Sequence, residues 1–197
     1  ELLKKNHVRI WQILPLNPVG YGNSPYQPYS SCAGDDIYIS LDTLAEEGLL
    51  KKSPMLFLEK CKKVDYERVR QYREPYLRAA FMAFVEQKGY EKPEYKEFAA
   101  QSWVYEYGVF RALKKANNGA CWNEWPEEDR TWPENRHVLD TEVEAEARYQ
   151  MFLQYIFYTQ WMKVKKAANE AGIQIMGDVP FYVGQDSVDV WGGKDNF

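Results

Sequence analysis

The hydrophobic pattern begins with a near-continuous apolar run at residues 8–16, VRIWQILPL. Such a run is typical of a parallel β-strand whose two faces are both covered. The next stretch, 17–34, is rich in Gly, Pro, Ser, Asn and Tyr and therefore predicts a long loop. Residues 37–39, IYI, predict a short extended segment before Leu41.

Helical periodicity, with interruptions, dominates the chain from about Thr43 to Gly172. Proline at the first position and glycine after the last are typical of helix ends, and both occur here. Three helices are predicted on this basis: 75–87, preceding Gly89; 93–116; and 142–171, preceding Gly172. The last two each have an apolar stripe at helical spacing: Trp103, Tyr107, Phe110 and Leu113, then Leu153, Phe157, Trp161, Val164, Ala168 and Ala171. Residues 117–140 are expected to be irregular.

A second short apolar run, IQIM at 173–176, follows the last helix and leads into a polar loop. Helix, glycine, buried strand and polar loop in this order are typical of a parallel α/β fold. Because two strands do not make a sheet covered on both faces, we expect the remaining strands to lie outside this sequence. The first residues, ELLKK, likewise predict the end of a helix already begun.

Composition limits the partners more than it identifies them. The net charge of -4 and the pI near 5.4 argue against nucleic acid or an anionic membrane as a partner, since both require a basic surface. No apolar run approaches the ~18 residues of a membrane span. Aromatic residues make up 16% of the chain, which fits either a large core or a surface that stacks on sugar rings. Composition leaves both interpretations open.

Cysteine and histidine give little support for metal or redox chemistry. Cys32, Cys61 and Cys121 lie far apart, so they fit buried thiols in a reducing compartment such as the cytoplasm. His7 precedes the first strand, and His137 lies in the irregular segment, so neither predicts a catalytic dyad. No metal site and no cofactor are expected.

The loop after the first strand, GYGNSPYQPYS at 20–30, carries candidate chemistry because functional groups gather at the carboxyl ends of parallel strands. Pro25 stands where a dinucleotide-binding loop has its third glycine, which disfavours phosphate binding. Interleaved Tyr, Ser, Asn and Gln suit a neutral polyol. A purely structural tyrosine-rich loop is the alternative.

The loop after the second strand begins with Asp178, between a glycine and a nearby proline. This arrangement fixes a carboxylate at a strand end, although a turn cap is the alternative. Asp186 and Asp189 are predicted to be caps or members of hydrogen-bond networks, and Trp191 is predicted to pack or stack. The acidic residues of 124–148 are expected to form a solvated face.

Three stretches resemble the amylomaltase family of 4-α-glucanotransferases: 11–44 (WQILPLNPVGYGNSPYQPYSSC…LDTL), 102–126 (SWVYEYGVFRALKK…WNEWP) and 154–191 (QYIFYTQWMKVKKAANEAGIQIMGDVPFYVGQDSVDVW). The resemblance implies an α/β fold, namely part of a (β/α)8 TIM barrel with a helix-rich insertion between its second and third strands. Residues 1–44 and 141–197 would be barrel portions, and 45–140 the inserted helical subdomain.

This resemblance also implies the chemistry. Family members transfer a 4-α-glucan segment between maltooligosaccharides, or other α-1,4-glucans, by retaining double displacement. Tyr26 and Asp178 match sugar-contacting positions of the family, and Ser24 and Gln27 are neighbouring candidates for substrate binding. No catalytic residue is assigned within this chain, because the family's RxDH motif is absent from it. The chain alone is therefore expected to be inactive without the rest of the barrel. A non-catalytic α-glucan-binding module and part of an α-glucan hydrolase are the alternatives.

Overall fold

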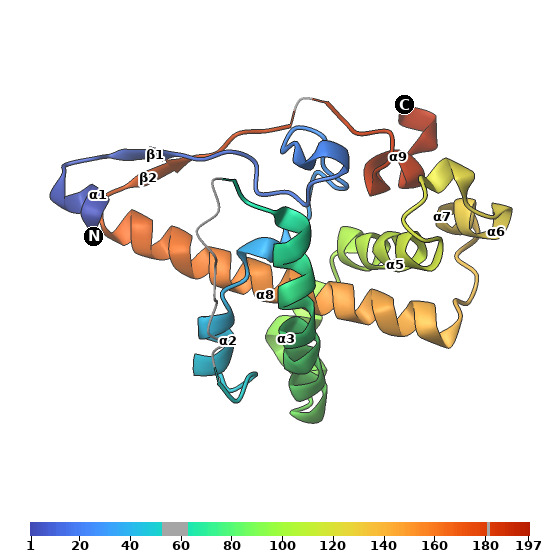
Figure 1. Ribbon diagram of the computed structural model, residues 1–197, viewed down its shortest axis with the longest axis horizontal. Coiled ribbons are helices and arrows are strands. Elements are labelled where there is room, and N and C mark those ends of the chain that lie inside the picture. Colours follow the sequence, from blue (N-terminus) through green and yellow to red (C-terminus); the bar gives the residue numbers. More distant parts are fainter. Residues whose placement is uncertain (53–62, 181) are drawn as a thin grey trace.

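The computed structural model describes residues 1–52, 63–180 and 182–197. One long helix, α8, extends along most of the longest axis of the molecule (Figure 1). The helices are α1 (Leu2–Lys5), α2 (Leu41–Glu46), α3 (Tyr66–Glu86), α4 (Pro93–Ala99), α5 (Ser102–Ala116), α6 (Glu127–Arg130), α7 (Trp132–Asn135), α8 (Thr141–Glu170) and α9 (Val188–Gly192), and the strands are β1 (Ile10–Gln12) and β2 (Gln174–Met176). Within these ranges, none of the helices has the length and apolarity needed to cross a membrane.

The two strands pair in parallel, as predicted, with Ile10 opposite Gln174 and Gln12 opposite Met176. The prediction that the first strand is covered on both faces is wrong for this chain. Ile10 is 54% exposed and Met176 is 47% exposed. The reason is that apolar strand faces become buried only where other elements pack on them, and here α8 is the main element beside β2.

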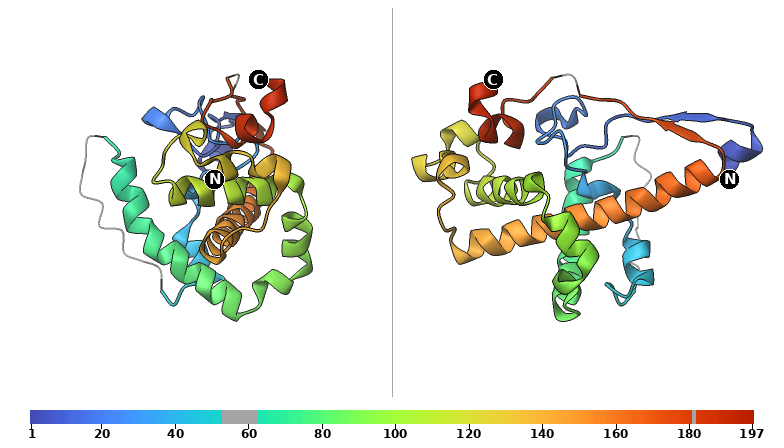
Figure 2. Two further views of the ribbon diagram at one scale, coloured as in Figure 1. Left: turned by 90° about the vertical axis from the view of Figure 1, so that its right-hand side faces the viewer. Right: turned by 180° about the vertical axis from the view of Figure 1, so that it is seen from behind.

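Helix α8 matches its prediction closely, and Gly172 after it adopts the left-handed conformation (φ 76°) that favours glycine. Helix α5 lies alongside the first half of α8, and α3 crosses near its middle (Figure 2). The apolar stripe of α8 is buried at Leu153, but Val164 in the second half is 44% exposed. The stripe therefore contributes to the core near Leu153 and not near Val164.

Two other predicted helices have different bounds. Pro75 lies inside α3, because this helix already begins after Asp65, whose carboxylate accepts a hydrogen bond from the backbone N–H of Arg68 at 3.0 Å. The predicted helix 93–116 is two helices, α4 and α5, because Gln101 between them has an extended conformation.

Local backbone geometry also differs from prediction at two short segments. Residues 37–39 do not form an extended piece, because Asp36–Tyr38 is a 3-10 turn capped by the side chain of Asp35. Gly89 does not supply a left-handed C-cap, since Lys88 has that conformation (φ 53°). A Cβ at Gly89 would instead lie 2.2 Å from the Phe84 ring, so the glycine is required for close packing.

The core consists of two main clusters of buried side chains. One packs α2 and α3 against α8, and the other packs α5 against the tryptophans of the segment 117–140 and α9. Trp191 is fully buried and stacks on Trp132, with ring centroids 5.8 Å apart. The predicted packing role of Trp191 is confirmed.

Candidate functional site

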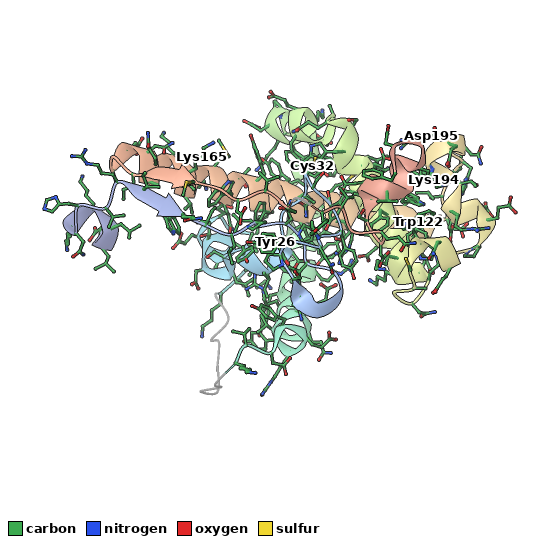
Figure 3. All side chains as sticks on the ribbon, turned by 90° about the horizontal axis from the view of Figure 1, so that it is seen from above. Tyr26, Cys32, Trp122, Lys165, Lys194 and Asp195 are labelled. Carbon is green, nitrogen blue, oxygen red and sulfur yellow. The ribbon has the colours of Figure 1, made fainter. Side chains whose placement is uncertain are left out.

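The loops that follow the two strands meet beyond the carboxyl end of the sheet, and Tyr26 lies on the first of them (Figure 3). The Tyr26 hydroxyl donates a hydrogen bond to Asp178 Oδ2 at 2.8 Å, although the two residues are 152 positions apart. This hydrogen bond, followed by partial burial and the Asp178 charge, raises the pKa of Tyr26. As the donor in this hydrogen bond, the phenol fixes the orientation of the carboxylate.

Further hydrogen bonds hold the same two loops together. The backbone N–H of Val188 donates to the carbonyl of Tyr29 at 2.9 Å. Asp189 accepts from Ser31 twice, from the backbone N–H at 2.9 Å and from the hydroxyl at 2.6 Å. Asp189 is thus a member of a hydrogen-bond network, as predicted. By tying the two loops together, it helps to hold Tyr26 next to Asp178.

Two glutamines of α8 hold the end of the first loop through paired amide contacts. Gln154 accepts from the Gly34 N–H at 2.8 Å and donates to the Gly34 carbonyl at 2.9 Å. Gln160 makes the same pair with Ser40, at 2.7 and 3.2 Å. A Cβ on Gly34 would lie 2.0 Å from the Phe157 ring, so only glycine allows this close approach.

A buried ion pair between the loop and α3 completes this support. Arg70 donates to both carboxylate oxygens of Asp35, at 2.9 and 2.7 Å, and also to Asp36 at 2.7 Å. Burial alone would raise the pKa of Asp35, but the hydrogen bonds and charge of Arg70 and two backbone N–H donors lower it overall. Asp35 is therefore a buried anion that depends on Arg70.

The other predicted substrate-binding residues lie in the same loop. The Ser24 hydroxyl accepts a hydrogen bond from the backbone N–H of Tyr26 at 3.4 Å, so it stabilises the turn that carries this tyrosine. Gln27 is exposed, and its carbonyl accepts from the Gly20 N–H at 3.2 Å. The Ser24 side chain thus contacts the backbone of the loop, whereas Gln27 takes part in the loop through its backbone carbonyl.

The cysteine prediction is wrong at Cys32, which is exposed because it lies on the surface loop rather than in either core cluster. Cys121 is half-buried, and burial raises the pKa of its thiol. Cys61 lies outside the described residues. His7 is exposed, and His137 lies 3.4 Å from Glu128. In the part of the chain that the structure describes, no cluster of His, Cys, Asp and Glu could hold a metal ion.

Sequence reasoning missed several buried polar contacts. Glu146 was expected on a solvated face, but its side chain is only 11% exposed and pairs with Arg78 and Lys115. The amide pairs of Gln154 and Gln160 were also missed. A signal for them existed, because a polar residue close to the apolar stripe of a helix needs a hydrogen-bond partner once it is buried.

Comparisons with known proteins agree on one family. A family model described as 4-alpha-glucanotransferase matches residues 1–197. Proteins named 4-alpha-glucanotransferase from Synechocystis and Thermus thermophilus are 40% and 37% identical over 95% and 100% of this chain. An Arabidopsis thaliana relative at 32% identity over 95% of the chain is named a chloroplastic/amyloplastic form.

A solved structure gives the same answer at the level of the fold. It is described as an amylomaltase from Streptococcus agalactiae in complex with acarbose. The superposition has a TM-score of 0.88 at 31% sequence identity and covers 99% of this chain. The chain spans 38% and 40% of the lengths of the Synechocystis and Thermus relatives, and 40% of the solved structure.

Proposed function

Because this chain belongs to the 4-alpha-glucanotransferase family, we propose that it supplies one wall of the glucan site of such an enzyme. The enzyme would transfer a 4-α-glucan segment from one maltooligosaccharide to the 4-hydroxyl of another. In this proposal β1 and β2 are the second and third strands of a (β/α)8 barrel. Residues 1–44 and 141–197 belong to the barrel, and 45–140 form an inserted helical subdomain.

The observation that carries the proposal is the hydrogen bond between Tyr26 and Asp178 at the carboxyl ends of paired parallel strands. A carboxylate has about four acceptor positions. Tyr26 occupies one on Oδ2, and the Val179 N–H occupies one on Oδ1 at 2.9 Å. The remaining lone pairs can accept from two sugar hydroxyls.

The role of these residues in the reaction is positioning and binding. In retaining double displacement, a carboxylate nucleophile forms a glycosyl-enzyme, and an acid/base residue serves both the leaving group and the acceptor. We place both of these residues outside this sequence. Asp178 and Tyr26 would hold the donor sugar in the geometry for attack, and Ser24 and Gln27 would extend the same surface.

The proposal is tested by the products that the full-length protein forms from maltotriose. Glucose together with maltooligosaccharides longer than maltotriose is the expected result, resolved by anion-exchange chromatography over a time course. Glucose and maltose without longer products would identify a hydrolase instead. Binding of maltotriose without any product would identify a non-catalytic α-glucan-binding module.

A further inference from the structure

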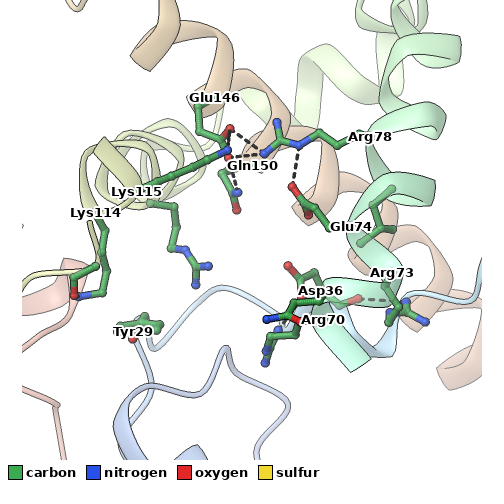
Figure 4. A pocket seen from close by; sticks show the side chains of 14 residues that line it. Tyr29, Asp36, Arg70, Arg73, Glu74, Arg78, Lys114, Lys115, Glu146 and Gln150 are labelled. Carbon is green, nitrogen blue, oxygen red and sulfur yellow. Dashed lines mark hydrogen bonds and ion pairs between the residues drawn. The ribbon is translucent and has the colours of Figure 1, made fainter. Parts of the chain in front are cut away.

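A charged pocket of about 400 Å³ lies on the side of the Tyr26 loop that faces α3, α5 and α8 (Figure 4). Six basic side chains from α3 and α5 line it: Arg70, Arg73, Arg78, Arg111, Lys114 and Lys115. Only three acidic side chains share its lining, namely Asp36, Glu74 and Glu146. The proposed glucan site makes no use of this pocket.

Five of the six cations already have partners. Arg70 pairs with Asp35 and Asp36, and Arg78 pairs with Glu74 and Glu146. The other three pairings are Lys115 with Glu146, Lys114 with Asp186, and Arg73 with the carbonyl of Ile39. With the partners Asp35 and Asp186 included, six cations face five carboxylates. One positive charge is left in excess.

Arg111 is the cation without a partner. Among the described residues its guanidinium makes no hydrogen bond and no ion pair, and its recorded contact is the Tyr29 ring, 5.2 Å from Cζ to the centroid. Lys114 Nζ lies 5.0 Å from the same centroid. Arg73 adds a second unused donor, because its buried Nε has no hydrogen-bond partner. A guanidinium left unpaired inside a pocket is unfavourable unless water or an anion satisfies it.

We propose that this pocket binds a small phosphate-bearing anion, with Arg111 as its principal ligand. The planar guanidinium of arginine can donate two parallel hydrogen bonds to phosphate oxygens. The excess positive charge of the pocket favours binding of an anion over binding of a neutral sugar. The volume falls in the range of roughly 300–1,000 Å³ that is usual for small-molecule sites, which suits pyrophosphate or a sugar phosphate. This inference is independent of the proposed glucan transfer.

The test is isothermal titration calorimetry of the full-length protein with inorganic pyrophosphate and, separately, with glucose 6-phosphate, at constant ionic strength. Saturable one-to-one binding of at least one compound is expected. Arg111→Gln should weaken it at least tenfold. Arg148→Gln is the matched control, because it removes the same charge from an exposed arginine that bonds Glu144 and lies outside the pocket. Its affinity should equal that of the wild type.

A conservative variant separates binding from folding. Arg111→Lys keeps the charge but loses the fork, so we expect an affinity between those of the wild type and Arg111→Gln. Both variants should melt within a few degrees of the wild type, since Arg111 has no described hydrogen bond or ion pair to lose and only its contact with the Tyr29 ring is affected. The absence of saturable heat with both phosphate compounds would overturn the inference. Equal weakening in Arg111→Gln and Arg148→Gln would overturn the inference as well, because it would indicate that the anion is attracted by the overall charge of the protein and not bound in the pocket.

Discussion

Asp178→Asn is expected to lower kcat/KM for maltotriose by roughly 10- to 100-fold in the full-length protein, in line with the loss of about 1.5–3 kcal/mol of charge-assisted hydrogen bonding. The amide keeps the shape of the carboxylate but replaces one acceptor oxygen with a donor. That change disrupts either the bond from Tyr26 or the bonds to sugar hydroxyls. Initial rates of glucose release from maltotriose measure the effect.

The matched control is Asp195→Asn, which makes the same chemical change at an exposed aspartate near the end of the chain. Its kcat/KM should equal that of the wild type. Tyr26→Phe should lower kcat/KM less than Asp178→Asn, because it removes one neutral donor and leaves the charged acceptor in place. Wild-type kinetics in Asp178→Asn would show that the carboxylate is only a turn cap.

The second large effect concerns stability. Arg70→Met is expected to lower the free energy of unfolding by about 3–5 kcal/mol, because it leaves the carboxylate of Asp35 buried without its partner. The side chain of Asp35 is only 2% exposed and accepts both arms of the Arg70 fork. Urea unfolding of the full-length protein, followed by tryptophan fluorescence, gives the difference in free energy.

The pH dependence of this difference has a definite sign. Because the pKa of Asp35 is lowered in the folded protein, its contribution to stability is present above the unfolded value of about 3.9 and is lost as the pH falls through the folded value. Without Arg70, burial raises the pKa of Asp35, so Arg70→Met takes up a proton and regains stability as the pH falls from 7 toward 4. The gap between the variant and the wild type should therefore narrow over this range, and it should narrow further below pH 4 as the wild type loses its own contribution. A gap that widens toward acid would contradict the assignment.

Arg148→Met provides the control for Arg70→Met, since its side chain is 68% exposed in a pair with Glu144 on the same helix. A loss of less than about 0.5 kcal/mol is expected for such a surface pair. Adding Asp35→Asn to Arg70→Met should recover part of the lost stability, because the uncompensated charge is then removed. No recovery would point to lost packing as the main cause.

Regular elements with a strong periodic signal could be predicted from the sequence. Helix α8 was predicted to within one residue at each end, because its apolar stripe and Gly172 agree. The parallel pairing of the strands was also predictable. Burial of the strands was not, because it depends on which elements pack against them, and Ile10 and Met176 stay exposed here.

In the candidate site, too, some residues could be predicted from the sequence and others depend on how the elements pack. The two loops and Asp178 could be singled out because each loop follows a strand, and parallel strands bring their carboxyl ends to one edge. Tyr26 was chosen among the tyrosines of its loop through the resemblance to the 4-α-glucanotransferase family. Their hydrogen bond fits that expectation at a separation of 152 residues. The supporting contacts of Arg70 and Gln154 could not be derived, since they depend on how α3 and α8 pack around the loop.

The most direct test of glucan recognition by Tyr26 and Asp178 is calorimetric titration of the full-length protein with acarbose. Binding does not require turnover, so it separates recognition from catalysis. Saturable binding to the wild type and to Asp195→Asn, weakened at least tenfold in Asp178→Asn, is the expected result. Equal affinity in all three proteins, or no binding to the wild type, would contradict the assignment of this pair to the glucan site.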